Sequence, residues 1–276
     1  MRTDLLACPE DHTALREDGD LLRCEHGHEW PVRDGAPVFT AAVGGFERRA
    51  EWERKQENSV PEYEQEEADQ QARRGTMAWT VGRLFGEFWS QPVGDAAKVL
   101  DVGCSVYAEL PYRRPAERFV GVDPLPGSPA REYEFVQAFG ERLPFAAGTF
   151  DVALLATSLD HVADPLAVLR ECARAAPRVA IWIGIIEPGL DFGVLEALAR
   201  VPREPLYRPR AAAAAARTLY ALNAAPKDYA DELHLHRFEL IQMRELVAAA
   251  GLALERQMLI TDYSQTTPHL FLDATR

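Results

Sequence analysis

A chain of 276 residues, 47% apolar and 26% charged, can form one α/β domain with a small additional module and has a globular composition. Its 43 acidic and 30 basic residues give a net charge of −13, which makes nucleic acid an unlikely partner because phosphate backbones are bound by clustered Lys and Arg. Neither a secretory signal nor an apolar run long enough for a membrane span is visible, and the four cysteines are far apart. We therefore expect a cytoplasmic protein without disulfides or membrane contact.

Residues 1–40 are predicted to form a small β module with a metal site. Two pairs share one spacing, Cys8 with His12 and Cys24 with His28, and the turn formers EDGD lie between the pairs, where a hairpin needs them. Thiolates and imidazoles are the usual zinc ligands, and structural sites take four of them. These four residues are the predicted ligands, with Asp11 as an alternative to His12 and loss of the metal as the other reading.

Residues 41–95 are predicted to be a helical linker that covers a cofactor. The segment is charged and Gln-rich, and its aromatic residues, such as Tyr63, Trp79 and Phe85, recur at helical spacing. The spacing predicts a helix over 64–90.

Residues 96–276 alternate short apolar runs with amphipathic stretches, which predicts a doubly wound, mostly parallel, seven-stranded α/β sheet. Asp164 and Pro165 are typical of a helix start, and Gly251 of a helix end. The last two strands are expected to form a hairpin at one edge. The predicted strands are 97–103, 118–124, 133–139, 150–158, 178–186, 252–261 and 269–275. Residues 187–232, with Tyr207, Arg208, Arg210 and Tyr220, interrupt the alternation and are expected to form a lid over the acceptor.

Polar and small residues follow each parallel strand, at the sheet edge where open α/β folds bind ligands. A carboxylate at the end of the second strand can accept hydrogen bonds from both hydroxyls of a ribose. The candidate cofactor residues are Asp101, Gly103, Cys104, Ser105, Asp123, Pro124, Phe139, Gly140, Glu141 and Thr157.

Three segments in order, VLDVGCS, FVGVDP and the stretch from FGERLPF to CARAAP, resemble the class I S-adenosylmethionine-dependent methyltransferases. The resemblance implies a Rossmann-like fold and S-adenosylmethionine as the cofactor. It implies that Asp101 and Gly103 lie beside the methionine moiety, that Asp123 binds the ribose, and that residues 139–141 frame the adenine. The chain departs from the family at Ser105 and Tyr107, where glycines are usual, and a side chain there can crowd the cofactor.

The N-terminal stretch also resembles the zinc-ribbon-like module that precedes the catalytic domain of some methyltransferases, most closely in WPVRDGAP. The resemblance implies a structural zinc. Cys24 and His28 fit one family variant, whereas Asp11 stands where the second cysteine of the first pair is usual.

His161, just after the fourth strand, is the candidate catalytic base, and Asp160 can orient or replace it. The alternative is that both residues only begin the following helix. His234 and His236 can line the acceptor pocket, bind a metal or stabilise a lid hinge, and we favour the structural role.

These features together predict a methyltransferase that acts on oxygen or nitrogen of a small molecule, such as a sugar or secondary metabolite. The alternatives are an RNA methyltransferase, for which Arg23, Arg33, Arg48 and Arg49 are the hints of a basic surface, and a non-catalytic or non-methylating cofactor-binding domain. The sequence leaves the oligomeric state open.

Overall fold

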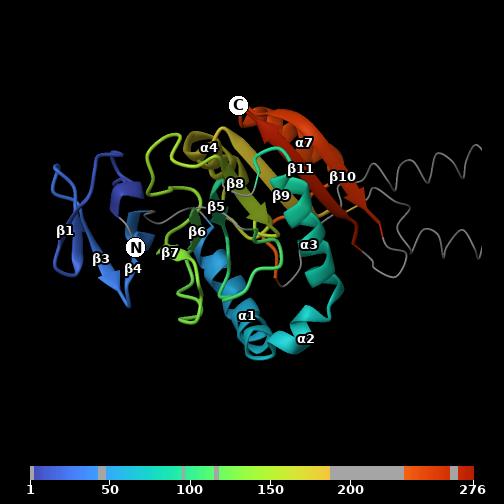
Figure 1. Ribbon diagram of the computed structural model, residues 1–276, viewed down its shortest axis with the longest axis horizontal. Helices are drawn as coiled ribbons and strands as arrows, with labels where there is room; N and C mark the ends of the chain where they lie inside the picture. The colour runs from blue at the N-terminus through green and yellow to red at the C-terminus, as the bar shows by residue number, and fades with distance from the viewer. Residues whose placement is uncertain (1–2, 43–47, 95–96, 115–117, 187–232, 262–266) are drawn as a thin grey trace, which may run out of the picture.

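The structure is a computed structural model that describes residues 3–42, 48–94, 97–114, 118–186, 233–261 and 267–276. A small β module lies at one end of the molecule, and a larger domain built on a central sheet follows it (Figure 1). The predicted lid, with Tyr207, Arg208, Arg210 and Tyr220, lies outside the described residues.

The N-terminal module is an antiparallel sheet with the strand order β1-β2-β3-β4. Its strands are β1 (Arg16–Asp18), β2 (Leu21–Arg23), β3 (Glu29–Arg33) and β4 (Ala36–Pro37), and short 3-10 helices lie at Thr3–Leu5 and Thr40–Ala42. The predicted hairpin between the two Cys/His pairs is confirmed. Gly19 turns the chain there with a φ of 62°, a conformation that glycine adopts without steric cost.

The N-terminal module packs directly against the edge of the larger sheet. Val38 bridges Gln137 in parallel, and Leu6 bridges Phe145. Arg142 donates to the carboxylate of Glu10 and to a backbone carbonyl of the module, both at 2.8 Å. The apolar side chains of the module therefore join one of the two cores of the larger domain.

The larger sheet has seven strands in the order β10-β11-β9-β8-β5-β6-β7. The strands are β5 (Lys98–Val102), β6 (Arg118–Asp123), β7 (Glu134–Gln137), β8 (Val152–Ala156), β9 (Arg178–Gly184), β10 (Ala253–Ile260) and β11 (His269–Thr275). β5 to β9 are parallel, and β10 and β11 form an antiparallel hairpin at one edge. The predicted mostly parallel, doubly wound sheet is confirmed.

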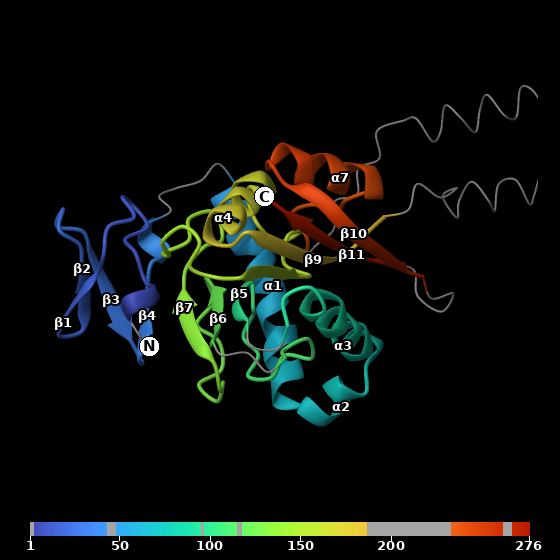
Figure 2. The same cartoon turned by 45° about the horizontal axis from the view of Figure 1, so that its top comes forward.

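Helices cover both faces of this sheet, so each parallel strand is buried on both sides (Figure 2). α3 (Met77–Ser90) packs Phe85 and Phe88 against Phe271 on one face. α4 (Pro165–Ala175) and α7 (Leu240–Ala249) cover the other. Asp164 caps α4 by accepting from the Ala167 N–H at 3.0 Å, as the sequence predicted.

The linker differs from the single helix predicted over 64–90. It forms α1 (Arg49–Ala68), α2 (Gln70–Arg74) and α3, and α1 runs through Pro61. The buried residues of α1 are Lys55, Gln56 and Ser59, so apolar periodicity gave no signal for its first turns. In the described part of the chain, no helix is long and apolar enough to cross a membrane.

Candidate functional site

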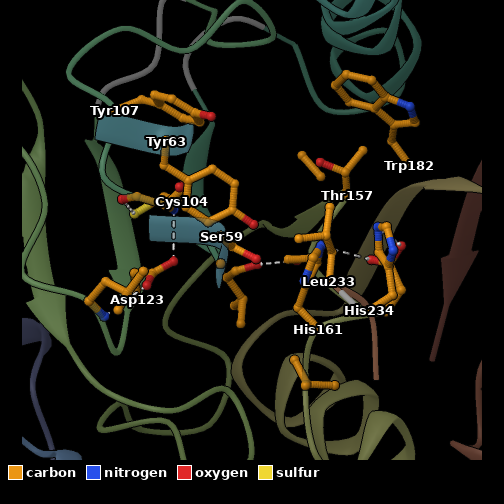
Figure 3. A pocket seen from close by; sticks show the side chains of 18 of the residues that line it. Ser59, Tyr63, Cys104, Tyr107, Asp123, Thr157, His161, Trp182, Leu233 and His234 are labelled. Atoms are coloured by element: carbon orange, nitrogen blue, oxygen red, sulfur yellow. Dashed lines mark hydrogen bonds and ion pairs between the residues drawn. The ribbon is translucent and has the colours of Figure 1, made fainter. Parts of the chain in front are cut away.

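A cavity of about 500 Å³ opens at the carboxyl ends of the parallel strands, beneath α1. In Figure 3, Asp123 lies on one side of Ser59 and Tyr63 of α1, and His161 and His234 lie on the other. All but one of the predicted cofactor and catalytic residues line this single cavity. The lining includes Gly103, Cys104, Ser105, Asp123, Pro124, Phe139, Gly140, Glu141, Thr157, Asp160 and His161.

Gly103 is fixed by its neighbours as well as by its backbone. Its φ is +83°, and a Cβ added there would lie 2.2 Å from the Cβ of Ser158. Ser158 in turn donates to the Val102 carbonyl at 2.6 Å and so joins the ends of β5 and β8. Ser158 was noted among the polar residues that follow the fourth strand, but this contact was not predicted because nothing in the local sequence reveals it.

Asp123 presents a buried carboxylate at the end of β6. Its two oxygens accept from the backbone N–H groups of Ser105 at 2.7 Å and Leu125 at 2.9 Å. Burial raises the pKa of Asp123 to about 6, and these two hydrogen bonds act in the opposite direction. Because each carboxylate oxygen has a second lone pair, both oxygens can still accept from a ligand hydroxyl.

Asp101 is the predicted residue that does not line the cavity. Its carboxylate is fully buried and accepts from the hydroxyl of Tyr112 at 2.9 Å. Burial raises the pKa of Asp101 to about 7. Tyr112 itself lines the cavity, so Asp101 supports the wall from behind.

The two departures from the family glycines are accommodated in different ways. Ser105 takes a left-handed conformation with φ of 58°, and its buried Oγ has no hydrogen-bond partner among the described residues. Tyr107 turns toward α1 and α2. Its hydroxyl donates to Glu66, Arg73 lies 3.5 Å from its ring centroid, and the next N–H, of Ala108, is 3.2 Å from the Glu67 carboxylate. We call these contacts of Tyr107 and Ala108 the α1 clasp.

The predicted adenine loop divides into a ligand-facing part and a structural part. The ring of Phe139 lies edge-on to Trp52 of α1, with centroids 5.2 Å apart, and both line the cavity. Glu141, by contrast, accepts from the N–H groups of Ala163 and Asp164 at 2.9 and 3.2 Å. Its side chain therefore holds the loop before α4. Trp52 was missed because it precedes the predicted helix.

Three polar side chains meet at the other end of the cavity. One ligand atom each of Asp160, His161 and His234 lies within 4.8 Å of the others. Asp160 is only 5% exposed, and its backbone carbonyl accepts from the N–H groups of Leu235 and His236 at 2.9 and 3.0 Å. These backbone bonds hold His234 beside the predicted catalytic pair.

His236 has a structural position, as favoured from the sequence. Its Nε2 lies 3.0 Å from the Val162 carbonyl, and the residue does not line the cavity. His234 does line the cavity, so the structural role that we favoured for both histidines describes only His236.

The wall beyond the three polar residues is aromatic. Trp182 donates from Nε1 to Nδ1 of His269 at 3.3 Å, and Trp79 of α3 also lines the cavity. Burial lowers the pKa of His269, which keeps its imidazole neutral. This end of the cavity therefore combines flat apolar surfaces with a few polar atoms, as is usual for small-molecule sites.

The predicted metal ligands of the N-terminal module need one correction. Cys8, Asp11, Cys24 and His28 each place one ligand atom within 4.8 Å of the others. His12 is exposed and outside this group, and the charges that act on its pKa include Arg174 and Glu171 of the larger domain. Its φ of 58° turns the chain at the knuckle, and Asp11, the alternative weighed in the sequence, lies with Cys8, Cys24 and His28 in its place.

Comparisons with known proteins agree with this arrangement. A methyltransferase domain family profile matches residues 100–178. An uncharacterized methyltransferase of Mycolicibacterium gilvum (strain PYR-GCK) is 29% identical over 169 residues, which are 52% of this chain and 66% of that protein. One from Mycobacterium sp. (strain KMS) is 29% identical over 55% of this chain and 69% of its own.

The fold is also that of a solved methyltransferase. The 1,6-didemethyltoxoflavin-N1-methyltransferase of Burkholderia thailandensis, solved with 1,6-didemethyltoxoflavin and S-adenosylhomocysteine, superposes with a TM-score of 0.54 at 15% identity. The match covers 95% of this chain and 98% of that one. At this identity the likeness concerns the fold. The profile and the two relatives are thus of methyltransferases, and the solved methyltransferase shares the fold.

Proposed function

We propose that this chain transfers a methyl group from S-adenosylmethionine to an oxygen or nitrogen of a small molecule such as a sugar or a secondary metabolite. One observation carries the proposal: a continuous cavity joins the buried carboxylate of Asp123 to the group formed by Asp160 and His161. The first end suits a nucleoside, and the second suits an acceptor that must lose a proton.

The residues at the first end fit the cofactor. Asp123 keeps one free lone pair on each oxygen for the ribose hydroxyls. Phe139 and Trp52 offer two aromatic surfaces for the adenine. When bound, the cofactor supplies an electrophilic methyl group on a sulfonium.

At the second end, His161 is the proposed base and Asp160 its partner. Nε2 of His161 lies 3.9 Å from Oδ1 of Asp160. The negative carboxylate stabilises the imidazolium that forms when His161 takes the acceptor proton. Asp160 is therefore proposed to make His161 a stronger base through its negative charge.

A small molecule suits the site better than RNA. Three of the four arginines that hinted at a basic surface lie beside carboxylates: Arg23 beside Asp18 and Glu29, Arg48 beside Glu51, and Arg49 beside Glu53. An RNA substrate would need such cations available for phosphates.

Calorimetry of the full chain with S-adenosylmethionine and S-adenosylhomocysteine tests the cofactor site. We expect micromolar binding of both, and Asp123→Ala should weaken it by about tenfold to a hundredfold because a ribose bond to a charged group is lost. Asp18→Ala, a surface aspartate of β1, is the control. Absence of binding to the wild type would refute the proposal.

Isotope transfer from labelled cofactor then tests the acceptor class and the non-catalytic alternative. We expect label in small hydroxylated compounds and none in structured RNA. Labelled RNA with unlabelled small molecules would refute the small-molecule part alone.

We also propose that Cys8, Asp11, Cys24 and His28 hold a structural zinc. Nδ1 of His28 lies 3.4 Å from Sγ of Cys8, 3.3 Å from Sγ of Cys24 and 3.3 Å from Oδ2 of Asp11. Ligands at the usual zinc–sulfur, zinc–nitrogen and zinc–oxygen lengths form a tetrahedron with mixed edges of about 3.3 to 3.6 Å. Thr13 donates to the other oxygen of Asp11 at 2.6 Å and fixes the carboxylate.

A further inference from the structure

Two imidazoles bracket the buried carboxylate of Asp160, one at each oxygen. Nε2 of His161 lies 3.9 Å from Oδ1, and Nε2 of His234 lies 3.7 Å from Oδ2. The two rings are 4.7 Å apart between centroids, and Figure 3 shows them side by side. The proposed function assigns a role to Asp160 and His161 but none to His234, which lies at the other oxygen of Asp160.

The contact with Arg237 favours one tautomer of His234. A guanidinium nitrogen of Arg237 lies 3.4 Å from Nδ1 of His234. Arginine can only donate, so this contact favours the tautomer in which Nδ1 accepts and Nε2 carries the hydrogen. His234 therefore directs an N–H donor toward Oδ2 of Asp160.

The same tautomer argues against a metal ion among the three side chains. Two histidines and one carboxylate are a common ligand set for transition metals. A metal at Nε2 of His234 would need the lone pair there, while Nδ1 already uses the only lone pair of the neutral ring to accept from Arg237. The three groups are therefore better suited to hold polar atoms of a ligand directly.

The distances define two positions for such atoms. Separations of 3.7 and 3.9 Å are too long for direct hydrogen bonds. At the Asp160–His234 pair, an oxygen set to the side can lie about 2.8 Å from both Oδ2 and Nε2. At the Asp160–His161 pair both atoms are acceptors, so a hydroxyl there donates its single hydrogen to Nε2 of His161. We call the position beside Nε2 of His161, where the hydroxyl donates its hydrogen, the reaction position. The one between Oδ2 of Asp160 and Nε2 of His234 is the anchor position.

The chemistry of the anchor position selects a hydroxyl. An atom there must accept from the His234 N–H and donate to the Asp160 carboxylate, and a hydroxyl does both. Because Nε2 of His161 and Nε2 of His234 lie at opposite oxygens of one carboxylate and their rings are 4.7 Å apart, the two positions are adjacent. Two hydroxyls on neighbouring carbons match that spacing.

We infer that the acceptor is a vicinal diol, methylated on the hydroxyl at the reaction position and held through the other hydroxyl by Asp160 and His234. This inference rests on the proposed function. The reacting oxygen forms a bond to the methyl carbon while the carbon–sulfur bond of the cofactor breaks and its electron pair stays on sulfur. The hydroxyl proton passes to Nε2 of His161. His234 binds the hydroxyl that does not react.

The test uses the full chain saturated with S-adenosylhomocysteine, so that binding is measured apart from turnover. The probes are catechol, an aromatic vicinal diol, and methyl mannoside, a sugar vicinal diol. Comparing them shows whether the site prefers an aromatic or a sugar acceptor. Resorcinol and guaiacol are the matched compounds that lack a free vicinal diol. We expect one of the two diols to bind at least about tenfold more tightly than resorcinol and guaiacol, the difference that about 1.4 kcal/mol gives.

Variants assign that preference to His234. His234→Ala should remove it, and His234→Gln should keep much of it because the amide can donate from near the Nε2 position. His236→Gln, on the neighbouring structural histidine, should leave the ratio between diol and control unchanged. Nitrogen-15 shifts of His234 in the wild type should show the hydrogen on Nε2, a readout that does not depend on the acceptor.

Several results would overturn the inference. They are equal binding of diols and controls, absence of diol binding by a chain that binds S-adenosylhomocysteine, a hydrogen on Nδ1 of His234, and diol binding that requires Mg²⁺ or Mn²⁺. In each case the cofactor site of the proposed function would stand. Failure to bind S-adenosylhomocysteine would instead remove the proposed function, and this inference with it.

Discussion

At position 103, both the backbone and the space around it require glycine, and this makes the residue a sensitive probe of the cofactor site. We predict that Gly103→Ala lowers the free energy of unfolding by about 3 kcal/mol, since a left-handed alanine costs about 1 to 2 kcal/mol and the overlap with Ser158 adds the rest. Urea denaturation measures the loss. Calorimetry should show that S-adenosylhomocysteine no longer binds.

Gly148→Ala measures the cost of the left-handed backbone alone, without the overlap that a Cβ meets at position 103. Gly148 has a φ of +68° but no atom within 4 Å of an added Cβ, so its variant should lose only about 1 kcal/mol and keep cofactor binding. Equal losses in the two variants would show that the contact with Ser158 has no energetic weight.

The raised pKa of Asp101 predicts that the free energy of unfolding depends on pH. The pKa of its carboxyl rises from 3.8 to about 7 on folding, because the group is fully buried. Between these values the folded chain holds a proton that the unfolded chain has released. The stability that this group contributes is therefore present at low pH and falls as the pH rises toward 7, by on the order of 1 kcal/mol per pH unit.

Asp101→Asn tests this dependence, because the amide cannot ionise but can still accept from Tyr112. Relative to the wild type, the variant should become more stable as the pH rises from 5 to 8, in urea denaturation at each pH. A difference between the two proteins that does not change with pH would contradict the raised pKa of Asp101.

At the scale of elements, the α1 clasp connects the helices of the linker to the cofactor loop after β5. Tyr107→Phe keeps the ring against Arg73 and removes the hydrogen bond to Glu66. We predict a loss of about 1 kcal/mol, a modest value because the bond is exposed to solvent. Hydrogen exchange should become faster in α1 and stay unchanged in the central strands.

Glu64→Gln, on an exposed position of the same helix, is the matched control for the clasp. It should leave exchange in α1 as it is in the wild type. Equal protection of α1 in the Tyr107→Phe variant would mean that the clasp does not hold the helix.

At the scale of the whole molecule, the N-terminal module stays folded against the edge strand β7, and we attribute part of its stability to zinc. We predict one zinc per chain by elemental analysis. Asp11→Ala and Cys24→Ala should lose the metal, whereas His12→Ala should keep it and Asp11→Cys should restore a four-ligand site. Chelation should unfold the module and leave the seven-stranded sheet, as far-ultraviolet circular dichroism and hydrogen exchange can follow.

If the His12→Ala variant binds no zinc, His12 must be counted among the ligands. A wild-type chain that takes up no zinc would show that hydrogen bonds alone hold Asp11, Cys24 and His28 together.

The sequence by itself determined the sheet and one end of the cavity. The buried runs from β5 to β9, the edge hairpin, and the polar residues after each strand follow from local patterns, because apolar periodicity and strand-end chemistry are written in neighbouring residues. For the same reason, the sequence alone was enough to place Asp123, Phe139 and Gly103 at the cavity.

Only the tertiary structure decided what depends on contacts between distant residues. The first turns of α1 bury polar side chains, so periodicity could not reveal them or Trp52. Asp11, and not His12, lies with Cys8, Cys24 and His28, because the knuckle turns one residue toward Cys24 and the other away. His234 reaches Asp160 through backbone bonds that span more than seventy residues, a proximity that spacing along the chain does not encode.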